Sequence, residues 1–461
     1  MSIIRSISGL RATIPDDLTE KVIISYCDSF SKLFPLGKIA IGRDGRPSGE
    51  WIENICTDIF SKLGRDVELL GIVPTPTVQL IVEKNDDISC GIAITASHNP
   101  SQWNGLKFIN SKGTFIDSVV NNKLWSLVDD FSEITIKTKL GKINHFENPL
   151  QKHIDIIKQI PIFSNDLIQQ IKNRKFKIVV DAVNASGSKI VPELLRDFNC
   201  EVVELFCDNS GEFPHTPEPL PQNLTELCKS VIENEADFGV AVDPDADRLV
   251  LIDEKGIPIG EERTICIAID TVMQNFDLFK ISSKNYRKVA TVNLSTTMLA
   301  EKISESYNGK CTYSPVGEIN VVNRMKDENS IIGGEGSGGV ILPECHYGRD
   351  SLVGIALLLI SLTQNNSSLS QLINKFPKFE MQKTKIDFTG NIEELINKVK
   401  IEFNSKKIDL QDGIKIIFED SWVQLRKSNT EPIIRIIAEG KDKLEIENHI
   451  LKVKGLISEK L

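Results

Sequence analysis

The chain has few of the features that mark membrane, secreted or nucleic-acid-binding proteins. Its longest apolar run, residues 352–362, is interrupted by Gly354 and Ser361 and is about half the length of a membrane span. The first residues, MSIIRSISGLRAT, lack the basic and then apolar layout of a signal peptide. Positive charge is scarce, because 54 Lys and Arg stand against 64 Asp and Glu, for a net charge of −10. We therefore expect a cytoplasmic protein that binds neither membranes nor nucleic acids.

The cysteines also exclude several classes of site. There are nine, at positions 27, 56, 90, 200, 207, 228, 266, 311 and 345. No two of them form a CxxC pair, so a zinc ribbon or a thioredoxin-type redox motif is not available. We interpret them as small buried apolar residues in a reducing compartment.

The remaining composition is that of a globular protein with several domains. Hydrophobic residues make up 41% and charged residues 26%. Three segments, 38–63, 177–195 and 288–303, each combine a β-rich run, a polar turn and an apolar helix. More than 100 residues separate their starts, which is too far for a solenoid. The pattern predicts three similar α/β domains in tandem, with parallel strands and crossover helices. In the first segment, Ser48 is the expected N-cap of a helix that ends at Gly64.

After about residue 376 the pattern changes. A helix near 392–404 is followed by three closely spaced strands and a closing helix over 441–457, which predicts a smaller antiparallel α+β domain. The expected boundaries are 1–150, 151–258, 259–375 and 376–461.

The first segment that suggests a catalytic site is TASHNP, Thr95 to Pro100, which comes directly after the apolar run ISCGIAI. Such a position puts the Ser97 hydroxyl on an exposed loop at the carboxyl edge of a sheet, where α/β proteins bind ligands. An ordinary turn is the alternative. His98 adjoins Ser97, which does not by itself make a base–nucleophile pair, and no GxSxG elbow is present.

The second is DPDADR, residues 243–248, between two apolar runs. Asp243, Asp245 and Asp247 alternate on a tight loop, and burying three like charges without a cation is costly. An EF-hand is rejected because Arg248 stands where its loop needs glycine and because the flanks read as strands. Three oxygen ligands leave positions open, which suits Mg²⁺ shared with a phosphate.

Two further segments favour sugar and phosphate binding. GGEGSGG, residues 333–339, allows close backbone approach at Gly334, and Glu335 and Ser337 offer hydrogen bonds to hydroxyls, although a flexible turn is the alternative. RKSNTEPIIR, residues 426–435, places arginines at both ends of a polar loop that can wrap a phosphate. The residues expected to contact that phosphate are Arg426, Ser428, Asn429, Thr430 and Arg435.

In this order, the four segments resemble the α-D-phosphohexomutase family, which comprises phosphoglucomutases, phosphomannomutases and phosphoglucosamine mutases. The resemblance covers nearly the whole chain and is supported by SGLR (8–11), GRDGRPSG (42–49), PTPT (74–77) and PVGE (315–318). It implies three similar α/β domains and a smaller fourth around a central cleft. It also implies a soluble enzyme that acts on a sugar phosphate as a monomer or homodimer.

The resemblance also assigns roles. Ser97 carries a phosphoryl group, and Asp243, Asp245 and Asp247 hold one Mg²⁺ against it, so that Ser97 completes the metal site. A hexose monophosphate takes the phosphoryl group, becomes a hexose 1,6-bisphosphate and returns its other phosphoryl group to Ser97.

Lys107, ten positions after Ser97, is the candidate for proton transfer. Arg11 resembles the family's N-terminal active-site arginine, Arg248 is expected to approach the phosphoryl group, and His98 is retained as a catalytic candidate.

Two departures from the family bear on the mechanism. Ala12 follows Arg11 at a position where glycine is usual. Gly339 ends the proposed sugar-binding loop, residues 333–339, at a position where many members have histidine. A histidine role in proton transfer therefore does not carry over to this chain.

The GEGxGG form of the sugar loop, with SISGLR and HYGRD, looks most like one branch of phosphoglucosamine mutases. It favours conversion of glucosamine 6-phosphate to glucosamine 1-phosphate. A glucose or mannose phosphate is the alternative substrate, and a serine-dependent phosphohydrolase or a non-catalytic sugar-phosphate sensor is a more distant one.

Overall fold

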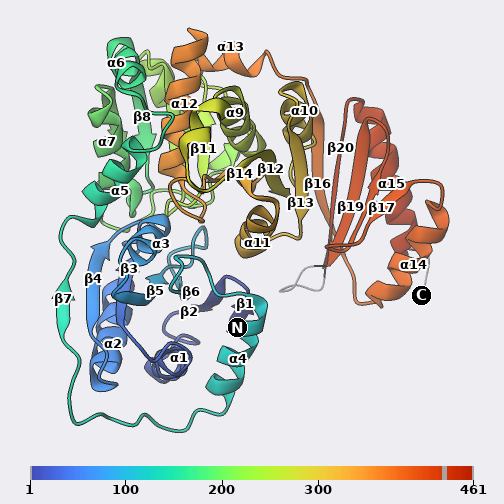
Figure 1. The fold of residues 1–461 in the computed structure, drawn as a ribbon. Coiled ribbons are helices and arrows are strands. Elements are labelled where there is room, and N and C mark those ends of the chain that lie inside the picture. Colours follow the sequence, from blue (N-terminus) through green and yellow to red (C-terminus); the bar gives the residue numbers. More distant parts are fainter. Residues whose placement is uncertain (1–2, 428–432, 459–461) are drawn as a thin grey trace.

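The computed structural model describes residues 3–427 and 433–458. Within them, four sheets follow one another along the chain, and Figure 1 shows the corresponding units in sequence colours. The predicted class, three α/β units followed by an antiparallel α+β unit, is confirmed. Among these residues no helix is both long and apolar enough to cross a bilayer.

The first unit is a mixed sheet covered by helices. Its elements are β1 (Ile4–Ser6), β2 (Gly9–Thr13), α1 (Glu20–Leu33), β3 (Lys38–Arg43), α2 (Gly49–Lys62), β4 (Val67–Ile72), α3 (Thr75–Glu83), β5 (Ile88–Ile94), β6 (Trp103–Ile109), α4 (Ser118–Asp129) and β7 (Ile143–His145). The strand order is β1-β2-β6-β5-β3-β4-β7. The predicted parallel pairing holds for β5, β3, β4 and β7, whereas β6, β2 and β1 extend the sheet in antiparallel fashion.

Ser48 precedes α2 as expected, but its side chain does not cap that helix. Its Oγ instead accepts a hydrogen bond of 2.9 Å from Nδ2 of Asn104 on β6. The hydroxyl thus joins α2 to the sheet.

The second unit contains α5 (Pro149–Lys158), α6 (Asn165–Arg174), β8 (Lys177–Asp181), α7 (Gly187–Asp197), β9 (Glu201–Leu205), the 3-10 helix η1 (Pro221–Asn223), α8 (Thr225–Glu233), β10 (Phe238–Val242) and β11 (Leu249–Ile252). Strands β9, β8 and β10 are parallel, and β11 returns antiparallel to β10.

The third unit contains α9 (Glu261–Gln274), η2 (Phe276–Ile281), β12 (Arg287–Asn293), α10 (Leu299–Ser306), β13 (Lys310–Ser314), α11 (Glu318–Glu328), β14 (Ser330–Glu335), β15 (Gly339–Ile341), α12 (Ser351–Asn365) and α13 (Leu369–Ile373). It repeats the arrangement of the second unit, because β13, β12 and β14 are parallel and β15 returns antiparallel to β14. The three predicted βα starts are therefore β3–α2, β8–α7 and β12–α10.

Helix α12 explains the apolar run in the sequence. Every residue from Ser351 to Leu362 is buried, and the helix packs against both α9 and α6. One hydrophobic cluster contains Phe238 of β10, Val292 of β12 and Leu357 of α12, so the second and third units share a core. This shared core holds the loops of the two units at fixed positions.

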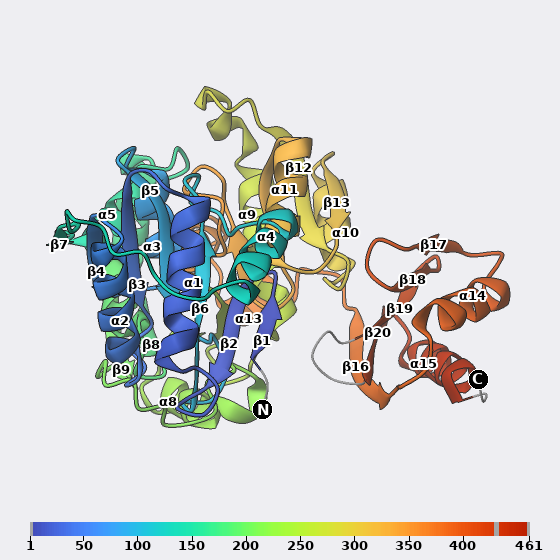
Figure 2. The ribbon, with the colours of Figure 1, turned by 90° about the horizontal axis from the view of Figure 1, so that it is seen from below.

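The fourth unit comprises β16 (Glu380–Asp387), α14 (Ile392–Glu402), β17 (Lys407–Asp409), β18 (Ile414–Ile417), β19 (Ser421–Lys427), β20 (Ile433–Gly440) and α15 (Lys443–Ser458). Its sheet, β16-β20-β19-β18-β17, is antiparallel throughout and has its own hydrophobic core. Figure 2 shows this unit standing beside the other three. The predicted boundaries at 150, 258 and 375 fall between the sheets and remain predictions.

Candidate functional site

The Ser97 loop follows β5 and is held in an unusual conformation. Ser97 has a φ of 50°, in the left-handed region, and its backbone N–H donates to Thr95 Oγ1 over 2.8 Å. The expectation of an exposed hydroxyl is wrong, because Ser97 is fully buried. Its Oγ points at the second unit and donates to Asp243 Oδ2 over 2.8 Å. The loop has turned this hydroxyl away from solvent and toward the carboxylates.

Arg46, a residue that the sequence analysis did not single out, holds the loop in place. Its guanidinium donates to the carbonyl oxygens of Ser97, Asn99, Pro100 and Trp103, and it pairs with Asp44 over 2.9 Å. Arg46 is completely buried. Five donors in a planar fork allow one side chain to satisfy several carbonyl groups at once, which fixes the loop.

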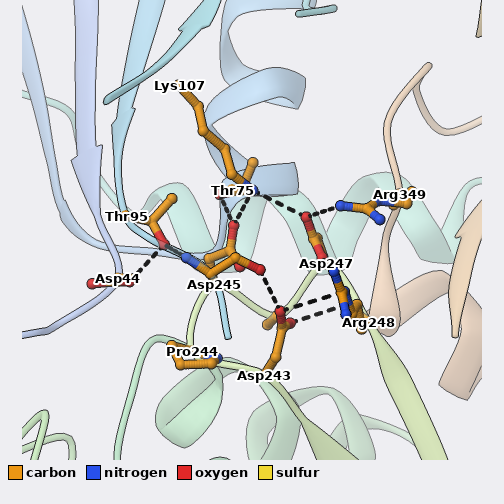
Figure 3. Close-up of polar contacts among 12 residues, drawn as sticks. Asp44, Thr75, Thr95, Lys107, Asp243, Pro244, Asp245, Asp247, Arg248 and Arg349 are labelled. Atoms are coloured by element: carbon orange, nitrogen blue, oxygen red, sulfur yellow. Dashed lines mark hydrogen bonds and ion pairs between the residues drawn. The ribbon is translucent and has the colours of Figure 1, made fainter. Parts of the chain in front are cut away.

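The three aspartates lie on the turn between β10 and β11. All are buried, and one oxygen from each lies within 4.8 Å of the others (Figure 3). Lys107 Nζ on β6 lies 2.6 Å from Asp245 Oδ2 and 3.1 Å from Asp247 Oδ2. Thr75 Oγ1 also donates to Asp245 Oδ2, over 2.5 Å. The first and second units therefore meet at this cluster.

The charges in the cluster perturb one another strongly. Burial, reinforced by the neighbouring carboxylates, raises the pKa of Asp243 to about 8. Burial also opposes ionisation of Asp247, but the charges of Arg349, Lys107 and Arg248 outweigh it and lower its pKa. Burial alone would lower the pKa of Lys107, but Asp245 and Asp247 reverse this and raise it. Lys107 is therefore held as an ammonium.

The donor set of the cluster fits a hard divalent cation. Asp245 Oδ1 and Asp247 Oδ1 are buried and have no hydrogen-bond partner, whereas the Oδ2 atoms of the same residues are occupied by Lys107. Buried carboxylate oxygens without partners are costly unless a cation binds them. Oxygen ligands in a rigid loop are those that Mg²⁺ uses.

The other predicted catalytic residues surround this cluster. Arg11 on β2 donates to Asn99 Oδ1 over 2.8 Å, and burial lowers its pKa. Arg248 Nε lies 3.9 Å from Asp243 Oδ2 and 3.8 Å from Asp247 Oδ1. His98 Nδ1 is 3.4 Å from Ser97 Oγ, and burial together with the nearby arginines lowers the pKa of His98 to about 2. His98 is therefore neutral at physiological pH.

The sugar-binding candidates lie at the end of β14. Glu335 Oε1 accepts from Asn293 Nδ2 over 2.8 Å and from the Gly317 N–H over 3.0 Å, and Oε2 accepts from Arg349 Nη1 over 2.8 Å. Gly334 precedes it on β14, and Ser337 lines the cleft beside it. Glu335 is thus already oriented by three protein donors.

The phosphate-binding candidates lie across the cleft, on the fourth unit. Arg426 on β19 and Arg435 on β20 are register partners, and both line the cleft. Arg426 Nε donates to Asp412 Oδ1 over 3.0 Å, which holds the guanidinium in position. The three other predicted contacts, Ser428, Asn429 and Thr430, lie outside the described residues.

A cleft of about 730 Å³ joins the sugar- and phosphate-binding candidates, and Arg11, His98 and Arg248, beside the buried serine and aspartates, also line it. All four units contribute to its lining, with residues that include Arg11, Arg248, Glu335 and Arg426. Further polar residues in the lining were not predicted from the sequence: Glu218, Glu262, Asn293, Glu318, Arg349 and Lys383. Two of these residues could have been found from the sequence, because Arg349 lies in HYGRD and Glu318 lies in PVGE, and both segments match the family.

A second cluster lies beneath the site and was also unexpected. Thr77 on α3 contacts His153 Nδ1 on α5 over 2.9 Å, and Nε2 of both His153 and His346 lies within 3.1 Å of Asp350 Oδ2. With Cys345 these residue types can ligate a metal. The nitrogen-to-oxygen distances of 2.8 and 3.1 Å are those of hydrogen bonds. We therefore interpret the cluster as a polar network that ties the first three units together.

Known protein families match nearly the whole chain. Family models described as "Phosphoglucomutase/phosphomannomutase, alpha/beta/alpha domain" I, II and III match residues 3–134, 151–256 and 262–379, and the C-terminal domain of the same family matches 389–452.

Two curated relatives and one solved structure illustrate the likeness. A phosphoglucomutase/phosphomannomutase of Thermococcus kodakarensis is 32% identical over 96% of this chain and 95% of its own. A phosphoglucosamine/phosphogalactosamine mutase of Sulfurisphaera tokodaii is 29% identical over 98% of both chains. A crystal structure of a phosphoglucomutase/phosphomannomutase family protein from Burkholderia thailandensis superposes with a TM-score of 0.85, at 23% identity over 99% of both chains.

Proposed function

The chain belongs to the phosphoglucomutase/phosphomannomutase family and is a phosphohexomutase, and on that premise we propose that it interconverts glucosamine 6-phosphate and glucosamine 1-phosphate through a phosphoserine at Ser97. One observation carries the assignment of the serine. Ser97 Oγ lies 2.8 Å from Asp243 in a buried cluster of three carboxylates, at a cleft lined by all four units. A hydroxyl in this position can carry a phosphoryl group next to a bound cation.

In the proposed reaction, phosphorylated Ser97 transfers its phosphoryl group to the free hydroxyl of the hexose monophosphate. The bond between Ser97 Oγ and phosphorus breaks as the bond from the sugar oxygen to phosphorus forms, so a bisphosphate results. The bisphosphate turns over in the cleft and returns its other phosphoryl group to Ser97. The large cleft and its arginines at opposite sides, Arg248 and Arg426, suit a ligand with a phosphate at each end.

Each transfer also moves one proton. In the first transfer it goes from the attacking sugar hydroxyl to the departing oxygen of Ser97, and in the return transfer it goes from the attacking Ser97 hydroxyl to the departing sugar oxygen. Lys107 is the proposed residue for this step because its ammonium is buried beside the aspartates. Since Asp245 and Asp247 keep it charged, its first role is to donate a proton to the oxygen that leaves. His98, which is neutral, is assigned to orientation of the loop.

Asp243, Asp245 and Asp247 are the proposed Mg²⁺ ligands. When bound, Mg²⁺ would offset the charge of the phosphoryl group and polarise its phosphorus for in-line attack. Arg11, which donates to Asn99 in the serine loop, and Arg248, which lies beside Asp243, add positive charge near Ser97 for the phosphoryl oxygens.

The choice of glucosamine rests on the carboxylates near the sugar loop. Glu335, Glu218 and Glu261 all line the cleft, and the carboxylate of each can accept from an ammonium group at C2 of the sugar. Glutamate also binds neutral hydroxyls, so a glucose or mannose phosphate is the alternative substrate. The relatives include both kinds of mutase.

The substrate prediction is tested by comparing kcat/KM for the phosphates of glucosamine, N-acetylglucosamine, glucose and mannose, in a coupled mutase assay with a trace of the matching bisphosphate. We expect glucosamine phosphate to be preferred by roughly tenfold, since close analogues differ by about 1–3 kcal/mol in such sites. A tenfold preference for glucose or mannose phosphate would overturn the substrate while leaving the mutase chemistry in place. Release of free phosphate in place of the isomer would instead support a phosphohydrolase.

The role of Arg426 makes a separate prediction. Arg426→Ala removes a charge-assisted contact to the phosphate that is not reacting, worth roughly 1.5–3 kcal/mol. The loss is expected mainly in KM and for both reaction directions, because one phosphate site serves both orientations of the bisphosphate. Asp412→Asn is the matched control, since it removes the negative charge that pairs with Arg426 but keeps the guanidinium and an oxygen that can accept from it. An effect of Arg426→Ala on only one direction would contradict a shared phosphate site.

A further inference from the structure

Arg349 connects the loop of the three aspartates (residues 243–248, the metal loop) to the glycine-rich loop (residues 333–339, the sugar loop). It lies just before Asp350, the N-cap of α12, and is 9% exposed at the floor of the cleft. Its Nη2 atom lies 2.6 Å from Asp247 Oδ2, and its Nη1 atom lies 2.8 Å from Glu335 Oε2. Its Nε atom lies 3.1 Å from Glu318 Oε2. Figure 3 shows its guanidinium directed at Asp247.

These three contacts use all three nitrogen atoms of the planar arginine fork. Each of its three nitrogens meets a different carboxylate, and the three carboxylates come from different elements: the β10–β11 turn, β14 and α11. Lysine has a single nitrogen at the end of a flexible chain and cannot fix three partners in one plane. The guanidinium therefore sets the position of the aspartate relative to the sugar-binding glutamate.

The path of the Arg349 side chain depends on Gly339. A Cβ atom at position 339 would lie 2.3 Å from Cδ of Arg349 and 2.9 Å from its Cγ, closer than nonbonded atoms approach. Any side chain at 339 would displace the arginine. Gly339, which stands where many family members have histidine, thus leaves room for the side chain of an arginine from a different loop.

The arginine also leaves the second oxygen of Asp247 without a hydrogen bond, with Arg248 Nε 3.8 Å away. Arg349 and Lys107 both bind Oδ2 of Asp247, and Oδ1 is the atom without a hydrogen-bond partner. The two cations therefore orient this carboxylate with one oxygen toward the proposed Mg²⁺ position.

We propose that Arg349 is a positioning residue for phosphoryl transfer, which aligns Asp247 with Glu335, and that Gly339 is required because it accommodates the Arg349 side chain. The inference rests on the proposed roles of Asp247 and Glu335. It predicts that the phosphoryl group and the sugar hydroxyl are misaligned when the link is lost, even though both still bind.

The first experiment compares Arg349→Ala and Arg349→Lys with the wild type. We expect Arg349→Ala to lower kcat by roughly tenfold to a hundredfold, because small misplacements of reacting groups are costly, with a smaller change in KM. Arg349→Lys should recover part of kcat, since it restores the charge but not the fork. Arg196→Ala, which removes an exposed arginine that pairs with Glu204, is the control and should keep wild-type activity.

The second experiment is a double-mutant cycle with Gly339→Ala. In the wild-type background this substitution should lower kcat at least about tenfold, because the new methyl group displaces Arg349. In the Arg349→Ala background it should cost less than about twofold, because the clashing atoms are gone. Equal costs in both backgrounds, or a kcat of Arg349→Ala within twofold of wild type, would overturn the proposal.

Thermal unfolding separates a loss of alignment from a loss of folding. If Arg349→Ala does not fold, Arg349→Lys and Gly339→Ala test the proposal in its place. The proposal then requires that both variants have a lower kcat and a Tm close to that of the wild type. The cycle can be run on whichever hexose phosphate is turned over best, so a wrong substrate does not affect it. A full kcat in Ser97→Ala would refute the proposed active site itself, independently of the cycle.

Discussion

Replacing Ser97 by alanine is expected to reduce turnover by roughly a thousandfold or more, because the substitution removes the atom that would carry the phosphoryl group. The fold should survive. The hydroxyl makes one strong hydrogen bond, to Asp243, and the loop around it is held by Arg46 through backbone carbonyl groups that the substitution leaves unchanged. Steady-state kinetics together with circular dichroism would check both parts of this expectation.

Mass spectrometry gives a second and independent measurement of the same residue. A fraction of the wild-type protein should be heavier by one phosphate, and Ser97→Ala should lack this species. Ser101→Ala is the matched control, since Ser101 lies exposed on the same loop and should keep both the phosphate and the activity. If the phosphate maps to a peptide without Ser97, the assignment of the phosphoserine is wrong.

Asp245→Asn is expected to raise the Mg²⁺ concentration for half-maximal activity by roughly tenfold or more and to depress the rate. Asp245 uses one oxygen for Lys107 and Thr75 and has its other oxygen free. Asparagine has only one oxygen, so either the lysine or the cation loses its acceptor. Activity should recover in part at high Mg²⁺, which a titration of rate against metal concentration would show.

Asp253→Asn serves as the control for this substitution. Asp253 follows the end of β11 that is far from the metal loop, and it accepts backbone hydrogen bonds through Oδ1, which asparagine can also accept. The activity of Asp253→Asn should depend on Mg²⁺ concentration in the same way as that of the wild type. Full activity of the wild-type enzyme in excess chelator would refute the metal assignment altogether.

Much of the architecture follows from local sequence patterns. The three βα repeats and the closely spaced strands after residue 376 predicted the fold class, because hydrophobic periodicity and turn residues act over short stretches of chain. The motifs around Ser97 and Asp243 were sufficient to identify the family, since each is a short segment of fixed spacing. The mixed pairing of the first sheet was not predictable in this way, because β2 joins β6 over a long stretch of chain, with Leu10 opposite Leu106.

Only the tertiary structure decided how the site is assembled. The sequence indicated that Ser97, Asp247 and Glu335 matter, but it assigned the serine to an exposed loop, whereas packing of the first unit on the second buries it. Arg349 meets Asp247 across 102 positions, and its path depends on the absence of a side chain at Gly339. Such contacts depend on the shared core that positions the second and third units, and no local periodicity encodes them.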